Sequence, residues 1–256
     1  MHTPKFLSLI TFLAAVLTAS AQAAVTAPTS VTSLGTGFDY SRGDYGFATD
    51  TEVFSVPLNL VHERGPLTLS ASFSWLTVKG PATVVGGSGA PRPTTASESG
   101  LGDIYAGATY QFGSLGGVVD VSGSARVKLP TADEDRGLGT GAADYYAELT
   151  FFRTFGSVTP FLTAGYRVLG DADTYDLRDG AYASGGAHFR LSAATVVTAL
   201  LSWRRPIVAG GDDAQEGLVM VSHDFAERWR VTAYALKGFT DASPDFGTGL
   251  AASWKF

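Results

Sequence analysis

The stretch Phe246-Gly-Thr-Gly-Leu-Ala-Ala-Ser-Trp-Lys-Phe256 decides the fold. Successive side chains of a β-strand point to opposite faces, so that residues two positions apart share a face. On this period one face of the stretch carries Phe246, Leu250, Ala252, Trp254 and Phe256. The residues between them are small or polar. We therefore predict a strand with one apolar face and one polar face.

Such a strand could close a membrane barrel, or it could be the last strand of a soluble β-sandwich. Trp254 and Phe256 resemble the C-terminal assembly signal of bacterial outer-membrane barrels. That resemblance favours the barrel, and the rest of the chain distinguishes the two folds.

Twelve segments of about ten residues have a strand-like pattern, and about ten residues is what a tilted strand needs to cross a membrane. The segments are Thr32–Ser41, Thr51–His62, Leu67–Lys79, Gly102–Phe112, Gly117–Leu129, Ala143–Phe155, Val158–Leu169, Ala181–Ser192, Thr195–Arg205, Glu216–Phe225, Trp229–Phe239 and Phe246–Phe256. An even number lets the first and last strands pair antiparallel, as they do in bacterial barrels.

The connections between these segments alternate between short and longer without a break. The short ones are Glu63–Pro66, Gly113–Gly116, Gly156–Ser157, Ala193–Ala194 and Ala226–Arg228. The longer ones are Arg42–Asp50, Gly80–Leu101, Pro130–Ala142, Gly170–Gly180, Pro206–Gln215 and Thr240–Asp245. Outer-membrane barrels have short periplasmic turns and longer external loops, whereas a sandwich has no reason to keep this alternation. The predicted fold class is all-β: a transmembrane antiparallel up-and-down β-barrel of about 12 strands.

Residues 1–23 are predicted to be a signal peptide that is removed, and residues 24–256 to form the barrel. Lys5 provides the positive start, Phe6–Leu17 is an apolar run, and Ala21-Gln-Ala23 is an A-x-A cleavage site. We therefore expect export to the outer membrane of a Gram-negative bacterium.

The composition excludes several classes of function. The chain has 0 Cys, which rules out disulfides, zinc–thiolate sites and cysteine nucleophiles. Its formal net charge of -6 argues against nucleic-acid binding.

Polar strand faces are expected to line the lumen, because a charge that faces hydrocarbon is costly. The candidate lumen-lining residues are Arg126, Lys128, Glu148, Arg167, His188, Arg190 and Arg204. With Arg230 and Lys255, seven basic residues are predicted on these faces. Four acidic residues oppose them, namely Asp103, Asp120, Glu148 and Asp224. This excess predicts a mild preference for anions. A barrel of twelve strands lies between filled and open ones, so a narrow or partly filled pore is expected.

No catalytic or metal site is predicted. The acidic residues Asp133, Glu134, Asp135, Asp171, Asp173, Asp212 and Asp213 fall in the longer loops without a calcium-loop spacing, which favours a solvated rim. Ser184 and His188 share a face, but four residues along a strand separate them by about 13 Å. That is too far for a nucleophile and its base. We therefore predict a protein that is not an enzyme and has no cofactor.

Several motifs resemble one known family. They are Ser99-Gly-Leu-Gly-Asp103, Lys128-Leu-Pro-Thr-Ala-Asp-Glu-Asp135, Gly137-Leu-Gly-Thr-Gly141, Asp144-Tyr145, Thr159-Pro-Phe161, Gly165-Tyr166 and Trp254-Lys-Phe256. Across essentially the whole of residues 24–256 the chain resembles the MetA-pathway of phenol degradation family of outer-membrane β-barrels. The resemblance implies a transporter or porin-like protein and supplies no catalytic residue. Its link to phenol comes from genetic neighbourhood.

Together these features predict a porin-like outer-membrane channel or facilitator for the passive passage of small solutes. The resemblance makes small aromatic or hydrophobic compounds candidate solutes. The alternatives are an outer-membrane hydrolase of the phospholipase or protease type, and a structural barrel with no transport. The expected partners are outer-membrane lipid and lipopolysaccharide, the barrel assembly machinery during biogenesis, and a small-molecule solute.

Overall fold

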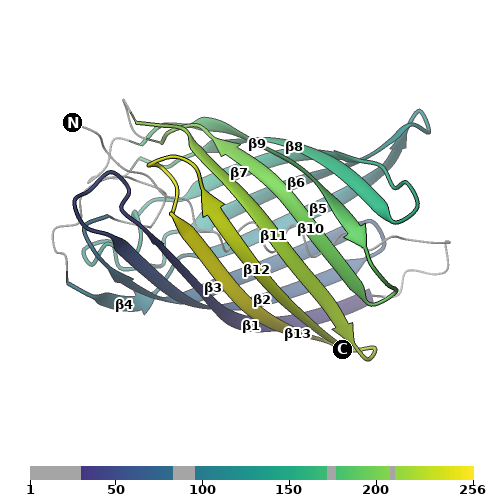
Figure 1. The fold of residues 1–256 in the computed structure, drawn as a ribbon, viewed down its shortest axis with the longest axis horizontal. Helices are drawn as coiled ribbons and strands as arrows, with labels where there is room; N and C mark the ends of the chain where they lie inside the picture. Colours follow the sequence, from purple (N-terminus) through teal and green to yellow (C-terminus); the bar gives the residue numbers. More distant parts are fainter. Residues whose placement is uncertain (1–29, 83–95, 172–176, 208–210) are drawn as a thin grey trace.

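The chain folds into one closed barrel of antiparallel strands that are strongly tilted (Figure 1). The computed structural model describes residues 30–82, 96–171, 177–207 and 211–256. Their strands are β1 (Ser30–Gly43), β2 (Thr51–Arg64), β3 (Leu67–Lys79), β4 (Glu98–Leu101), β5 (Ile104–Leu115), β6 (Val119–Leu129), β7 (Asp144–Phe152), β8 (Val158–Val168), β9 (Gly180–Arg190), β10 (Thr195–Arg204), β11 (Ala214–Phe225), β12 (Trp229–Gly238) and β13 (Phe246–Lys255). The predicted signal peptide, Asp173 and most of the loop between β3 and β4 lie outside the described residues.

Thirteen strands fill twelve positions around the barrel, because β4 and β5 both pair with β3. Trp75 pairs with Leu101 and Ser72 with Tyr105, so β3 advances three residues while its partner advances four. This extra residue is a β-bulge at Gly102-Asp103. The prediction of twelve strands is confirmed. The predicted start of the fourth strand at Gly102 is wrong, because the bulge lets pairing continue outward to Glu98.

Short turns and longer loops lie at opposite ends of the barrel, as predicted. We call the end with short turns the inner end and the other the outer end. The inner turn at Gly116-Gly117 uses two glycines with φ of 59° and 71°, a left-handed conformation that tight hairpins require. The outer connections span residues 44–50, 80–97, 130–143, 169–179, 205–213 and 239–245. The described residues include no helix that is long and apolar enough to span a membrane.

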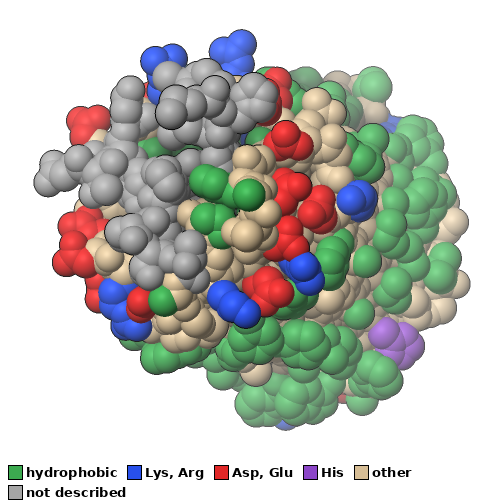
Figure 2. Space-filling view, turned by 60° about the vertical axis from the view of Figure 1, so that its left-hand side comes forward, with side chains coloured by type: hydrophobic (Ala, Val, Ile, Leu, Met, Phe, Trp, Pro, Cys, Tyr) green, Lys and Arg blue, Asp and Glu red, His purple; other side chains and the backbone are tan. Residues whose placement is uncertain are grey.

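The two faces of each strand differ as the alternation predicts. Phe246, Leu250, Trp254 and Phe256 are exposed on the outward face of the last strand, whereas Gly247 and Gly249 are buried on the inward face. Figure 2 shows hydrophobic side chains over the flank of the barrel, with charged side chains gathered at the outer end. An exposed apolar belt around a polar interior is typical of a membrane barrel.

The barrel closes where β1 pairs with β13, from Ser33 opposite Lys255 to Arg42 opposite Phe246. Beyond this ladder, the Phe256 amide donates to the Thr32 carbonyl at 2.9 Å. The seam is tight at Gly37, where a Cβ atom would lie 2.2 Å from the carbonyl oxygen of Leu250. Closure therefore depends on a glycine at this position.

We expect Gly37→Ala to destabilise the folded barrel by roughly 1–3 kcal/mol, because the seam has to shift to admit the methyl group. Gly35→Ala is the matched control, since a Cβ atom there would approach no atom closer than 3.2 Å. Urea unfolding of both variants in lipid vesicles measures the difference. Equal stability of the two variants would contradict the tight fit at Gly37.

Candidate functional site

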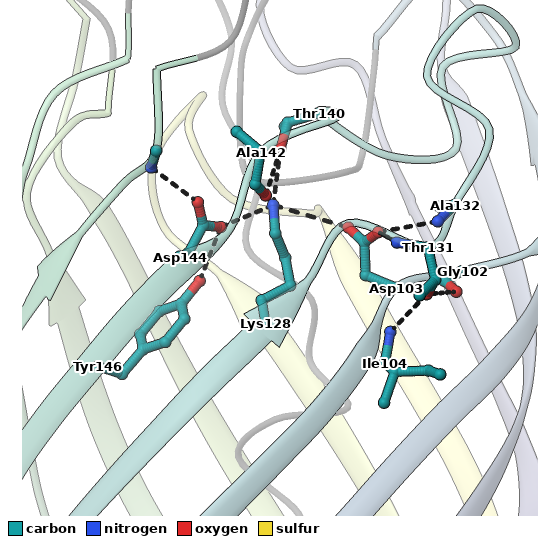
Figure 3. Close-up of polar contacts among 11 residues, drawn as sticks. Gly102, Asp103, Ile104, Lys128, Thr131, Ala132, Thr140, Ala142, Asp144 and Tyr146 are labelled. Carbon is teal, nitrogen blue, oxygen red and sulfur yellow. Dashed lines mark hydrogen bonds and ion pairs between the residues drawn. The ribbon is translucent and has the colours of Figure 1, made fainter.

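A fully buried ammonium group lies at the outer end of β6 (Figure 3). The Nζ atom of Lys128 lies 2.7 Å from a carboxylate oxygen of Asp144 and 3.6 Å from one of Asp103. It also donates a hydrogen bond to Oγ1 of Thr140 at 2.6 Å. A charge buried to this degree requires such partners, because it has lost its water. We call Lys128, Asp103, Thr140 and Asp144 the lysine cluster.

The lysine cluster also anchors the outer loops. Oδ1 of Asp103 accepts hydrogen bonds from the backbone amides of Thr131 and Ala132, both at 3.0 Å. Oδ1 of Asp144 accepts one from the amide of Gly170 at 3.2 Å. Thr131 and Ala132 after β6, and Gly170 after β8, are therefore fixed to side chains of the barrel interior.

Outer-loop residues fold inward and form an apolar cluster at the outer end. Tyr45, Val78, Ala82 and Leu138 are almost completely buried against one another, although they come from three different parts of the chain. Burial raises the pKa of the Tyr45 phenol well above its usual value. Described outer-loop residues therefore occupy part of the outer end of the barrel.

Two more of the candidate basic residues are buried in the lumen near its outer end. Arg204 binds Glu216 through both terminal nitrogens, and the Nη1–Oε2 distance is 3.0 Å. Arg167 instead donates from Nη2 to the backbone carbonyl of Arg205. These contacts join the ends of β8 and β10 and the start of β11.

Aromatic rings hold a third arginine against the wall. The guanidinium of Arg126 lies 4.3 Å from the ring centre of Tyr146 and 5.6 Å from that of Tyr105. Cation–π attraction to rings on both neighbouring strands keeps this side chain close to the strands.

Two tyrosines lie flat on the inner wall over glycines. Tyr182 crosses Gly165 and donates to Glu148 at 3.1 Å. Tyr234 crosses Gly249 in the same way and donates to Asp39 at 2.6 Å. A Cβ atom on either glycine would lie 2.3 Å from the ring, so both positions need glycine for the ring to lie there.

The inner part of the lumen carries a second set of charges. Arg230 binds Asp224 at 2.6 and 2.9 Å, and Lys255 lies 3.8 Å from the same carboxylate. Arg190 is exposed at the inner end of β9, where its backbone amide binds the carbonyl of Ser157.

The geometry does not bring a nucleophile and a base together at Ser184 and His188. Nδ1 of His188 is hydrogen-bonded to Oγ1 of Thr198 at 2.8 Å, and its ring stacks on Phe161 at 4.8 Å. Ser184 lies directly opposite Thr163 and Ser202 on the two neighbouring strands. The described residues contain no group of three or more His, Cys, Asp or Glu side chains that could hold a metal ion.

The predicted excess of basic charge in the lumen is wrong. Asp144 and Glu216 are buried there with Lys128 and Arg204, and Asp39 is the acceptor for Tyr234. With these three and the four already expected, the acidic groups on the described inward faces are at least as many as the seven basic ones. The strand alternation could have revealed them, because Asp144 has the same parity as Glu148, and Glu216 the same as Asp224. The charge argument for anion preference therefore fails.

One section of the lumen wall is apolar, which the sequence analysis missed. Leu200, Leu218, Met220, Tyr234 and Leu236 are only 2 to 6% exposed, and Phe161 packs against them. We call these six residues the apolar wall. Pairing places Leu218 directly between Leu200 and Leu236, so three leucines lie side by side across β10, β11 and β12. In the sequence this pattern is hidden, because Met220 and the charged Asp224 share a face of β11.

The family described as "Putative MetA-pathway of phenol degradation" matches residues 17–256. The chain belongs to this family. The motifs Gly-Leu-Gly-Asp103, Lys128-Leu-Pro-Thr, Leu138-Gly-Thr140 and Asp144-Tyr each supply one residue of the lysine cluster. Their presence in this chain is thus explained by the anchoring of the outer loops.

Solved outer-membrane barrels have similar folds. The COG4313 outer membrane channel from Pseudomonas putida F1 has a TM-score of 0.69 and 14% identity, over 93% of this chain and 100% of that one. The KdgM porin has a TM-score of 0.57 and 9% identity, over 87% of this chain and 99% of the porin. The translocator domain of the autotransporter NalP from Neisseria meningitidis has a TM-score of 0.52 and 10% identity, over 96% of this chain and 93% of that domain. At these identities the likeness shows the fold alone. No curated protein sequence matches the chain.

We expect Lys128→Met to destabilise the barrel by roughly 3–5 kcal/mol, because two buried carboxylates lose their counter-charge. The loop of residues 130–143 should also become accessible to protease added to folded protein. Arg42→Met is the control, since it removes an ion pair with Asp50 that is largely exposed and contributes little. Unfolding in urea and limited proteolysis measure both effects. A Lys128→Met barrel as stable as the Arg42→Met barrel would show that the lysine cluster does not hold the outer end together.

Proposed function

We propose that the protein is a porin-like channel of the Gram-negative outer membrane, through which small solutes pass passively. The observation that carries this proposal is the contrast between the two faces of the closed barrel. The outward face exposes large apolar side chains, and the inward face holds polar and charged groups. In a bilayer this arrangement creates a polar path through a hydrocarbon layer.

The fold comparisons support a channel over an enzyme. The similar structures include an outer membrane channel and a porin. Within the lumen, the wide separation of Ser184 and His188 supports the same choice. Lipid and lipopolysaccharide around the apolar belt, and the barrel assembly machinery during biogenesis, are the partners that this location implies.

Small aromatic or hydrophobic compounds are the solute class that we favour. The family's description names phenol degradation, and this supports that choice.

Purified protein in a planar bilayer should give discrete conductance steps in KCl solution. The steps should be small, because buried loop residues occupy part of the outer end. Assays for released fatty acid and for peptide cleavage on the same preparation should show no turnover. Absence of conductance would favour the structural barrel, and lipid or peptide hydrolysis would favour the hydrolase.

The orientation can be tested by single cysteines, since the chain has 0 Cys of its own. A membrane-impermeant maleimide should label Asp135→Cys on intact cells but label Glu227→Cys only after lysis. Both native residues are exposed, at the outer and inner ends respectively. The unsubstituted protein is the control. Labelling of Glu227→Cys alone on intact cells would reverse the orientation.

A further inference from the structure

Three polar side chains on β2 and β3 face the lumen and are partly exposed there. They belong to Asn59, Ser70 and Ser72. Residues next to them along each strand, such as Leu60 and Phe73, are exposed on the outward face instead. Among the residues that the structure describes, none of the three polar side chains has a hydrogen-bond partner. We call these three residues the polar patch, and it is open to water or to a solute inside the barrel.

Strand pairing brings the members of the polar patch close together. Asn59 lies directly opposite Ser72, and Ser70 is two residues farther along β3. Directly opposite residues have Cβ atoms about 5 Å apart, and residues two positions apart on one face are separated by about 7 Å. One small molecule can therefore contact all three side chains.

Glycines on both sides leave the polar patch uncovered. Gly35 on β1 pairs with Asn59, and Gly107 on β5 pairs with Ser70. A Cβ atom at Gly107 would lie 3.1 Å from the Oγ atom of Ser70, so any larger residue there would lie against that hydroxyl. The two glycines thus keep the polar groups accessible from the lumen.

Elsewhere in the lumen, hydroxyl groups bind one another across neighbouring strands. Thr150 is hydrogen-bonded to Thr163 at 2.8 Å, and Ser222 to Thr232 at 3.0 Å. Such pairs satisfy their own donors and acceptors and offer less to a passing molecule. The polar patch differs because its hydrogen-bonding capacity is left for water or a solute.

We propose that the polar patch binds the hydroxyl group of small uncharged solutes, aromatic or aliphatic, as they pass through the lumen. This inference rests on the proposed channel function, and it names a contact site on the solute's path. A hydroxyl group that leaves water loses hydrogen bonds, and their loss is costly unless other groups replace them. The three unpartnered side chains can provide that replacement.

The chemistry of the polar patch suits a neutral hydroxyl better than an ion. A serine hydroxyl and an asparagine carboxamide can each donate and accept hydrogen bonds, as an alcohol or phenol hydroxyl does. An ion would use only one of these capacities. The positions that pair with the polar patch on the neighbouring strands carry no charge either, since they are Gly35, Val61, Tyr105 and Gly107.

Binding can be measured through the ion current, with the uncharged polyol erythritol as the probe. Erythritol should reduce the KCl current of the wild-type channel, and the reduction should saturate with concentration. Ser70→Ala combined with Ser72→Ala should raise the half-blocking concentration roughly fivefold, the effect of losing about one hydrogen bond. Ser72→Thr keeps the hydroxyl and should retain the wild-type value.

The matched control combines Ser184→Ala with Ser202→Ala. These two serines also face the lumen and lie opposite each other, but they are only 5% and 8% exposed. Their loss should leave the half-blocking concentration unchanged. Because the chain has 0 Cys, access can be tested separately. A thiol reagent that cannot cross the membrane should lower the current of Ser72→Cys and leave that of Ser202→Cys unchanged.

Heat-modifiable migration in gels confirms that each variant is folded before it is measured. If the Ser70 and Ser72 double variant does not fold, Asn59→Ala replaces it. No block of the wild type by erythritol, an equal half-blocking concentration in the two double variants, or no reaction at Ser72→Cys would overturn the inference and leave the channel in place. A wild-type protein that carries no current would overturn the proposed function itself.

Discussion

Closure of the sheet is the constraint on which the rest of this structure depends. In hydrocarbon no water is available to an unpaired backbone amide or carbonyl, so a spanning sheet has to pair its first strand with its last. The pairing of β1 with β13 meets this requirement over ten residue pairs. It also fixes the alternation of faces around the whole ring. Every inward side chain described above is inward because the seam joins in one register and no other.

The closed ring places unusual demands on the side chains inside it. Charged groups in the lumen cannot be left bare, and most of those described have a partner on an adjacent strand or loop, as Arg204 has Glu216. The lysine cluster applies the same rule at the outer end, where it also fixes loops. The same carboxylates therefore neutralise the buried lysine and hold the outer-loop backbone in place. Polar groups on the lumen wall stabilise the barrel by pairing with one another, and the apolar wall packs between them.

Much of the fold could be predicted from the residue pattern, because a membrane barrel repeats one simple rule in every strand. Alternating polarity and alternating loop length were enough to define the class, twelve strands and most of their limits. The bulge at Gly102-Asp103 was not predicted, because a single extra residue does not show in the alternation of polar and apolar residues. The partners of Lys128 could not be predicted for another reason. They come from positions 103, 140 and 144, and only the folded loops bring them together. The apolar wall escaped because apolar residues on an inward face look like errors of register until the neighbouring strands are known.

The tyrosines that lie over Gly165 and Gly249 have a consequence for how such a passage can change over time. The number of strands sets the diameter of the ring, but the free bore also depends on how far the large side chains stand away from the wall. A glycine on the strand between tyrosine and carboxylate lets the ring lie against the backbone. Replacement of that one glycine would push the ring toward the axis and narrow the bore without altering a single strand. Related barrels with the same twelve-strand frame can thus acquire different calibres through changes at one or two small residues.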